Sequence, residues 1–148
     1  MGTHYKGNKQ EIAALSAFIN LIRAADSMLS RAVRLMEADG LSHCQFAVLE
    51  VLYHLGPMRQ HELASKILRS PGNITFVLDK LETAKLVQRK KESSDRRCFM
   101  IVLTPLGRKK ISAIFPEHVK NLTKEMASLS IEELGVLRSL CRKVGKGE

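Results

Sequence analysis

A cluster of basic side chains in the middle of the chain is suited to binding a polyanion. Its members are Arg89, Lys90, Lys91, Arg96 and Arg97. Guanidinium and ammonium groups stay charged at neutral pH and bind phosphate oxygens through charge-assisted hydrogen bonds. Asp95 directly precedes the last two arginines, where its carboxylate can orient a neighbouring guanidinium. A run of basic residues is often only a solvated surface, but the placement of Asp95 favours a contact with a phosphate backbone.

The distribution of charge along the chain supports the same interpretation. The 148 residues carry a formal net charge of +9. Residues 56–111 hold 13 Lys or Arg and 5 Asp or Glu, whereas the remaining residues carry a net charge of only +1. Because nearly all of the excess lies in one contiguous segment, the sequence predicts a localised anion-binding face in that segment.

A second group of candidate contacts lies in residues 70–75, which read SPGNIT. Serine at an N-cap followed by proline at the first helical position is a strong helix start. Asn73 and Thr75 fall off the apolar stripe that this helix would bury, and Gly72 permits close approach to DNA. Polar residues at the start of a helix can reach base edges in the major groove. A capped helix with an exposed polar face would also explain this segment, but not the basic cluster after it.

A long amphipathic helix is predicted to precede these groups. Apolar residues recur at helical spacing from Ile12 to Met36, over about seven turns, and Gly40 offers a C-terminal break. Such a long helix in so short a chain predicts burial against a partner chain. Ser42 and Gln45 then form a capping-box pattern that opens a second helix.

Two shorter helices and a hairpin follow. We expect helices over about residues 60–68 and 70–84, after which the hydrophobic period changes to that of strands over 86–91 and 98–103. This order is typical of a winged helix-turn-helix, whose second helix enters the major groove. An arginine at the tip of the hairpin, or wing, can enter the minor groove. The candidate DNA contacts are Ser70, Gly72, Asn73, Thr75, Phe76, Lys80, Arg89, Lys91, Arg96 and Arg97.

Two helices are predicted after the hairpin. Thr104 and Pro105 repeat the N-cap and proline pattern, and Pro116 is expected to kink or divide the helix that they start. Ser130 and Glu133 form another capping-box pattern, which opens the last helix. The predicted fold class is mainly α with a small two-stranded β-wing, a winged helix-turn-helix flanked by N- and C-terminal helices.

Other kinds of chemistry find little support in the sequence. The three cysteines, Cys44, Cys98 and Cys141, are far apart and include no CxxC, so we expect buried structural thiols rather than disulfides or a zinc site. The five histidines form no HxH or HxxxH, and we expect neither a metal nor a cofactor. GxSxG, P-loop and GxGxxG motifs are missing, and no carboxylates are paired for acid–base work, so an enzyme is not expected.

Composition predicts a globular protein of the cytoplasm. The sequence is 45% hydrophobic and 26% charged, which is close to average for globular proteins. We expect no membrane span, because no apolar run approaches the roughly 18 to 20 residues that a bilayer requires. The N-terminal residues are followed by no apolar segment of a secretory signal.

The wing carries a family resemblance. Residues 95–107 fit the pattern D-x-R-x5-L-T-x2-G, through Asp95, Arg97, Leu103, Thr104 and Gly107. This pattern resembles the wing signature of the multiple antibiotic resistance regulator (MarR) family. The resemblance is close from about residue 42 to residue 111, and the flanking helices agree in length and order.

The resemblance implies a homodimeric transcription factor of one domain. Residues 8–40 and 105–148 would form the dimer, and each winged lobe, residues 42–104, would bind half of a pseudo-palindromic double-stranded operator. Arg97 would reach the minor groove, and Asp95 would hold the wing through Arg69.

The resemblance also implies a signal. Most members are repressors released by a small molecule, and short stretches of this chain resemble a branch that responds to quinones or phenols, so a phenolic, quinone-like or anionic ligand is expected. Ser27, His43 and Tyr53 would border its pocket. Two alternatives stay open: a redox-sensing repressor that uses Cys44, and a winged helix that binds protein without binding DNA.

Three residues depart from the family pattern. Arg59 stands where Ser or Thr commonly caps the first helix of the motif. Lys85 stands where glycine usually ends the recognition helix, so a left-handed backbone there would be strained. Phe76 replaces a residue that is usually basic, which removes one expected phosphate contact.

Overall fold

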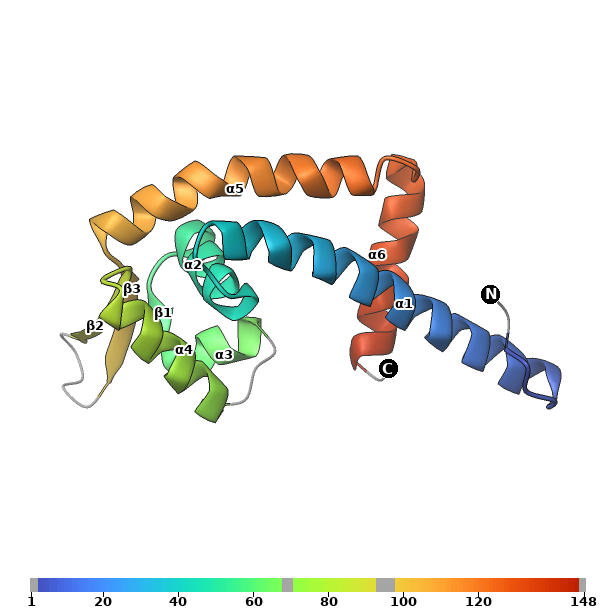
Figure 1. Cartoon of the computed structure of the whole chain (residues 1–148). Coiled ribbons are helices and arrows are strands. Elements are labelled where there is room, and N and C mark those ends of the chain that lie inside the picture. The colour runs from blue at the N-terminus through green and yellow to red at the C-terminus, as the bar shows by residue number, and fades with distance from the viewer. Residues whose placement is uncertain (1–2, 68–70, 93–97, 147–148) are drawn as a thin grey trace. The chain divides into compact units, whose positions relative to one another are not determined.

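The computed structural model describes residues 3–67, 71–92 and 98–146, with the side chains of Pro71, Gly72 and Lys146 left out. The elements in these ranges are α1 (Lys9–Ala38), α2 (His43–Leu55), β1 (Met58–Arg59), α3 (Gln60–Lys66), α4 (Pro71–Thr83), β2 (Val87–Lys91), β3 (Phe99–Leu103), α5 (Pro105–Glu125) and α6 (Ile131–Lys146) (Figure 1). The chain divides into two compact units, Met1–Pro116 and Glu117–Glu148, and each is described by itself. The mainly helical fold class with a small β-wing is confirmed.

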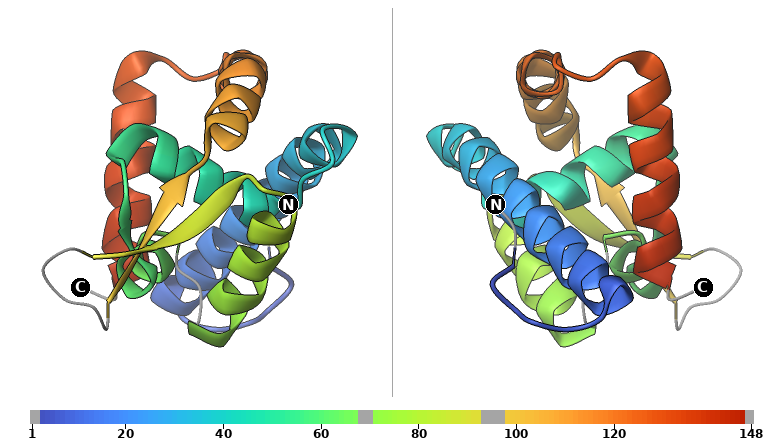
Figure 2. Two further views of the ribbon diagram at one scale, coloured as in Figure 1. Left: turned by 90° about the vertical axis from the view of Figure 1, so that its left-hand side faces the viewer. Right: turned by 90° about the vertical axis from the view of Figure 1, so that its right-hand side faces the viewer.

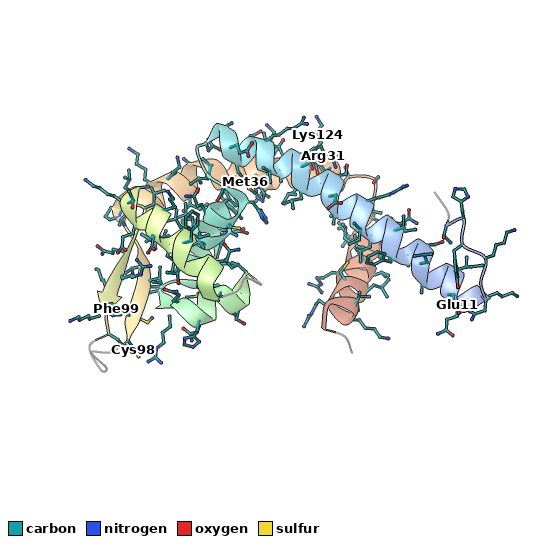
Figure 3. All side chains as sticks on the ribbon, turned by 60° about the horizontal axis from the view of Figure 1, so that its bottom comes forward. Glu11, Arg31, Met36, Cys98, Phe99 and Lys124 are labelled. Carbon is teal, nitrogen blue, oxygen red and sulfur yellow. The ribbon has the colours of Figure 1, made fainter. Side chains whose placement is uncertain are left out.

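Helix α1 has a complete cap at each end. The Asn8 side chain accepts a hydrogen bond from the Glu11 amide at 2.9 Å, and the Glu11 carboxylate accepts one from the Asn8 amide at 2.9 Å. The helix ends at Ala38, and Gly40 adopts a left-handed φ of 73°, as the sequence predicted. Met36, which lies where α1 approaches α2 (Figure 3), is its one buried residue.

The expectation that no apolar segment approaches membrane-spanning length is wrong for α1. An 18-residue window of this helix has a mean hydropathy of 1.4, so α1 is long and apolar enough to cross a membrane by length and composition alone. Polar residues interrupt the alanines and large apolar residues of α1, so its high mean hydropathy is not visible as one unbroken apolar run. Arg23 and Asp26 nevertheless lie near its middle, where charges are costly in a bilayer.

The hydrophobic core of the first unit lies inside the winged lobe (residues 42–104) and extends to the start of α5. Its fully buried large side chains are Leu49, Leu52, Leu63, Ile74, Leu78, Leu81, Ile101 and Ile111. They come from α2, α3, α4, β3 and α5, and Val87 of β2 is buried with them, so α4 and β2, which carry the described candidate contacts, are anchored on one core. Full burial of each such side chain contributes roughly 1.5 to 3 kcal/mol.

The sheet has three antiparallel strands in the order β1-β3-β2, which comprise the predicted two-stranded wing, β2 and β3, and a third strand, β1, that the sequence did not indicate. Val87 pairs with Leu103 and Lys91 with Phe99 in the hairpin, and Met58 pairs with Ile101 across the third strand. Strand β1 has only two residues, too few to show alternation in the sequence. It ties the start of the helix-turn-helix to the wing (residues 87–103).

The exit from α4 confirms the strain expected at Lys85. Its φ is 58°, in the left-handed region that favours glycine. The Thr104 hydroxyl donates to the Lys85 carbonyl at 2.6 Å and accepts from the Gly107 amide at 2.9 Å. A Cβ at Gly107 would lie 1.9 Å from the Leu86 carbonyl oxygen, so only glycine fits at that turn of α5.

Two predicted helix details differ from the structure. Helix α3 ends at Lys66, before the expected end at residue 68, which lies outside the described residues. Helix α5 is one helix from Pro105 to Glu125, so Pro116 does not divide it.

The second unit consists of the end of α5 and helix α6. Ser130 caps α6: its hydroxyl accepts from the Glu133 amide at 3.1 Å, and the Glu133 carboxylate accepts from the Ser130 amide at 2.8 Å, which confirms the predicted capping box. Apolar side chains of α6 are exposed in the chain: Ile131, Val136, Leu137, Leu140 and Val144.

Candidate nucleic-acid interface

Helices α3 and α4 form the helix-turn-helix, and each buries one face in the core. Helix α3 starts without a side-chain cap from Arg59, as its identity led us to expect; the Glu62 carboxylate instead accepts from the Arg59 amide at 2.8 Å. Leu63 and Ala64 of α3 are buried, and so are Ile74, Val77, Leu78 and Leu81 of α4. The polar face of α4 is therefore turned away from the core.

The outward face of α4 carries four of the predicted contacts. Asn73, Thr75, Phe76 and Lys80 are all exposed. The Gln60 side-chain amide of α3 donates to the Thr75 hydroxyl at 2.7 Å, which joins the two helices of the motif at the surface. The Lys80 ammonium lies 5.4 Å from the centre of the Phe76 ring. Gly72 lies in the first turn of α4, whereas Ser70 lies outside the described residues.

Strand β2 runs beside α4 (Figure 2) and carries further basic residues. Lys90 and Lys91 are exposed on it. The four residues that complete the predicted wing chemistry, Arg69, Asp95, Arg96 and Arg97, lie outside the described residues. The Asp95–Arg69 pair and the two arginine contacts therefore stay predictions.

Arg89 has a contact that the sequence did not indicate. Its guanidinium forms ion pairs with Asp79, at 2.6 Å, and with Glu82, both on α4, and its amide donates to the Glu82 carboxylate at 3.2 Å. Burial alone would lower the pKa of Arg89, but the hydrogen bonds with Asp79 and Glu82 outweigh burial and raise the pKa above its ordinary value. Arg89 thus fastens β2 to α4.

A second ion pair fastens the wing to the start of α3. Arg59 Nη2 lies 2.7 Å from Glu92 Oε2, and Arg59 Nε lies 3.2 Å from the same oxygen. This hydrogen-bonded partner raises the pKa of Arg59 above its ordinary value. The two residues are 33 positions apart, so no local spacing in the sequence could have paired them.

A cavity of about 610 Å³ lies between the helix-turn-helix and the sheet. Its lining combines apolar and polar side chains with the two ion-paired arginines: Arg59, Gln60, His61, Ile74, Thr75, Arg89, Cys98, Phe99 and Ile101. Cys98 and Phe99 are labelled where β3 begins in Figure 3. Because Thr75 and Arg89 both line this cavity, the wing and α4 border one continuous surface.

The three predicted ligand-pocket residues have different surroundings. Ser27 accepts from an Arg31 guanidinium at 2.7 Å on α1. His43 lines a groove of about 370 Å³ together with Glu50, His54 and Lys66, among others. Tyr53 packs its ring 5.0 Å from that of His54 and 5.6 Å from the Arg108 guanidinium. Tyr53 lies ten positions after His43 on α2, about 15 Å along the helix.

The thiols differ from the prediction in one case. Cys44 and Cys98 are half-buried, but Cys141 is exposed on α6, so the expectation of a buried thiol is wrong for Cys141 in the single chain. Within the part of the chain that the structure describes, no group of three or more His, Cys, Asp or Glu is placed to hold a metal ion.

Comparisons with known proteins agree with this geometry. The model of the MarR family matches residues 41–99. The transcriptional regulator MhqR of Bacillus subtilis is 36% identical over 132 residues, which cover 89% of this chain and 91% of MhqR.

Two solved structures extend the likeness to the whole chain. The MarR family regulator AbsC of Streptomyces coelicolor superposes with a TM-score of 0.85, covers 97% of each chain and is 20% identical, which shows the fold alone. NadR in complex with 4-hydroxyphenylacetate has a TM-score of 0.77 and is 25% identical over 100% of both chains.

Proposed function

The chain belongs to the MarR family of transcriptional regulators, and from this premise we propose that it is a homodimeric repressor of a pseudo-palindromic operator, working in the cytoplasm. One observation carries the proposal for DNA: the outward face of α4 is polar and exposed, and it lies beside the basic strand β2. A helix that presents such a face can enter the major groove while the wing follows the backbone.

Within this interface we divide the predicted contacts into two roles. Ser70, Gly72, Asn73, Thr75, Phe76 and Lys80 would face the major groove, and Lys91, Arg96 and Arg97 would follow the backbone and the minor groove. Arg89 is reassigned as a positioning residue, because Asp79 and Glu82 already occupy its guanidinium. Asp95 would orient the wing through Arg69.

The dimer is supported by apolar surface that the single chain leaves uncovered. Helix α1 exposes Ile12, Phe18, Leu21, Ile22, Leu29 and Leu35. In the second unit, α6 exposes a further apolar stripe, and a groove of about 400 Å³ is lined mostly by apolar side chains, including Leu122, Met126 and Leu134. Exposed apolar surface of this extent marks an interaction site, and a second copy of the chain would cover it.

We further propose that a phenolic, quinone-like or anionic molecule releases the repressor. NadR, at 25% identity, binds 4-hydroxyphenylacetate, which is both a phenol and an anion. The His43 groove offers imidazole and ammonium groups from His43, His54 and Lys66 to such a ligand. Tyr53 borders the same region through His54.

The test measures fluorescence anisotropy of an operator duplex obtained by in vitro selection with the full-length protein. We expect sequence-specific binding that weakens steeply with salt, because bound phosphates release counterions. Selection without an enriched sequence would contradict the proposal. In a second arm, 4-hydroxyphenylacetate should release the duplex from the wild type and less readily from His43→Ala. His4→Ala, which lies outside both the His43 groove and the helix-turn-helix, serves as the control, and equal release from both variants would remove His43 from the ligand site.

A further inference from the structure

Phe76 is the feature of α4 that the core does not explain. Its side chain is 63% exposed, although it is the largest apolar group on this helix. Ile74 and Leu78, two positions before and after it, are both fully buried. At 100° per residue each of them lies about 160° around the helix from Phe76, so the ring stands opposite the buried stripe.

The neighbours of Phe76 make this face suitable for approaching DNA. Lys80, one turn further along α4, places its ammonium 5.4 Å from the ring centre, within the range of a cation–π contact. Asp79 also lies on the exposed side, where a free carboxylate would repel phosphate. Arg89 pairs with that carboxylate at 2.6 Å, so the acid next to the ring is neutralised.

The chemistry of the ring limits what it can recognise. A phenyl group neither donates nor accepts a conventional hydrogen bond, so Phe76 cannot read the donor and acceptor pattern of a base pair. The apolar group that base pairs present in the major groove is the C5-methyl of thymine. Burial of the exposed ring against that methyl would remove apolar surface of both partners from water.

We propose that Phe76 is a specificity-determining residue that reads thymine in each half-site by packing against its C5-methyl group. The inference rests on the proposed function, because it requires α4 to enter the major groove. A basic residue at this position would contact a phosphate, whereas Phe76 would contact a base instead.

The test changes the DNA and leaves the protein intact. In the selected operator, deoxyuridine replaces thymine at one symmetric pair of positions at a time, which deletes only the methyl group. At one such pair the affinity of the wild-type protein should fall about fourfold per half-site and roughly 15-fold for both. If every substitution leaves the affinity unchanged while the duplex is still bound specifically, the inference is wrong and the proposed function stands.

Variants then assign the methyl contact to the ring. Phe76→Ala should bind the thymine and deoxyuridine duplexes equally, whereas Phe76→Leu should retain part of the discrimination. Tyr5→Ala, which truncates an exposed aromatic residue before α1 and outside the winged lobe, is the control and should keep the full thymine preference. Undiminished discrimination by Phe76→Ala would overturn the proposal. Absence of any selected operator would instead overturn the proposed function, and this inference with it.

Discussion

Helices α4 and α1 are both amphipathic, but the chain buries the apolar face of α4 and leaves most of the apolar face of α1 exposed. Four apolar residues of α4 are buried inside the chain, so its 13 residues already have a fixed place in the winged lobe. Helix α1 has 30 residues, and only Met36 is buried. The difference indicates that α4 is positioned by its own chain, whereas most of the apolar face of α1 would be buried only in the proposed dimer.

The largest effect is expected from removing α6, the helix of the second unit. Deletion of the residues after Ser128 removes α6 and its exposed apolar stripe. We expect the truncated protein to lose the dimer, as measured by sedimentation equilibrium, while circular dichroism still detects the helices of the winged lobe. A truncated chain that sediments as a stable dimer would contradict the assignment of α6.

Paired alanine substitutions sharpen the comparison at single side chains. Leu78→Ala opens a cavity in the core of the winged lobe and should lower the free energy of unfolding by about 2 to 5 kcal/mol. Leu140→Ala removes the same atoms from an exposed position of α6, so it should weaken dimerisation instead. Chemical denaturation and sedimentation of both variants provide the measurements, and similar effects on both quantities would refute the distinction.

The smallest expected effect separates positioning from phosphate contact within the winged lobe. Arg97→Ala should weaken DNA binding and reduce the salt slope by about one per half-site. Arg89→Ala combined with Asp79→Asn removes the link between β2 and α4 without leaving Asp79 as an unpaired charge, so it should weaken binding roughly tenfold but leave the slope unchanged. Affinities measured over a series of salt concentrations decide between the two roles. A reduced slope for this double variant would make Arg89 a phosphate contact.

Local chemistry made much of this fold predictable. The capping boxes at Ser42 and Ser130 form as their spacing indicated, and Lys85 adopts the left-handed backbone that its place at the end of α4 required. These features depend on residues three or four positions apart. Periodicity likewise separated the buried face of α4 from the face that carries the candidate contacts.

Long-range chemistry was not predictable in the same way. The Arg59–Glu92 pair and the clamp on Arg89 join different elements, so only the folded chain brings their partners together. Strand β1 was missed because two residues show no alternation. Pro116 was expected to kink or divide its helix, and a single proline in the sequence could not show that α5 would continue past it.

The hydroxyl of Thr104 has a mechanical consequence. The hydroxyl group donates to the backbone just after α4 and accepts from the first turn of α5, so one side chain joins the end of α4 to the start of α5. The backbone beside it has little freedom to yield, since Gly107 already touches Leu86. Under the proposed function, a rotation that begins in α5 would therefore move the end of α4 as well, and a ligand bound to the helices would influence the DNA-binding face by this route.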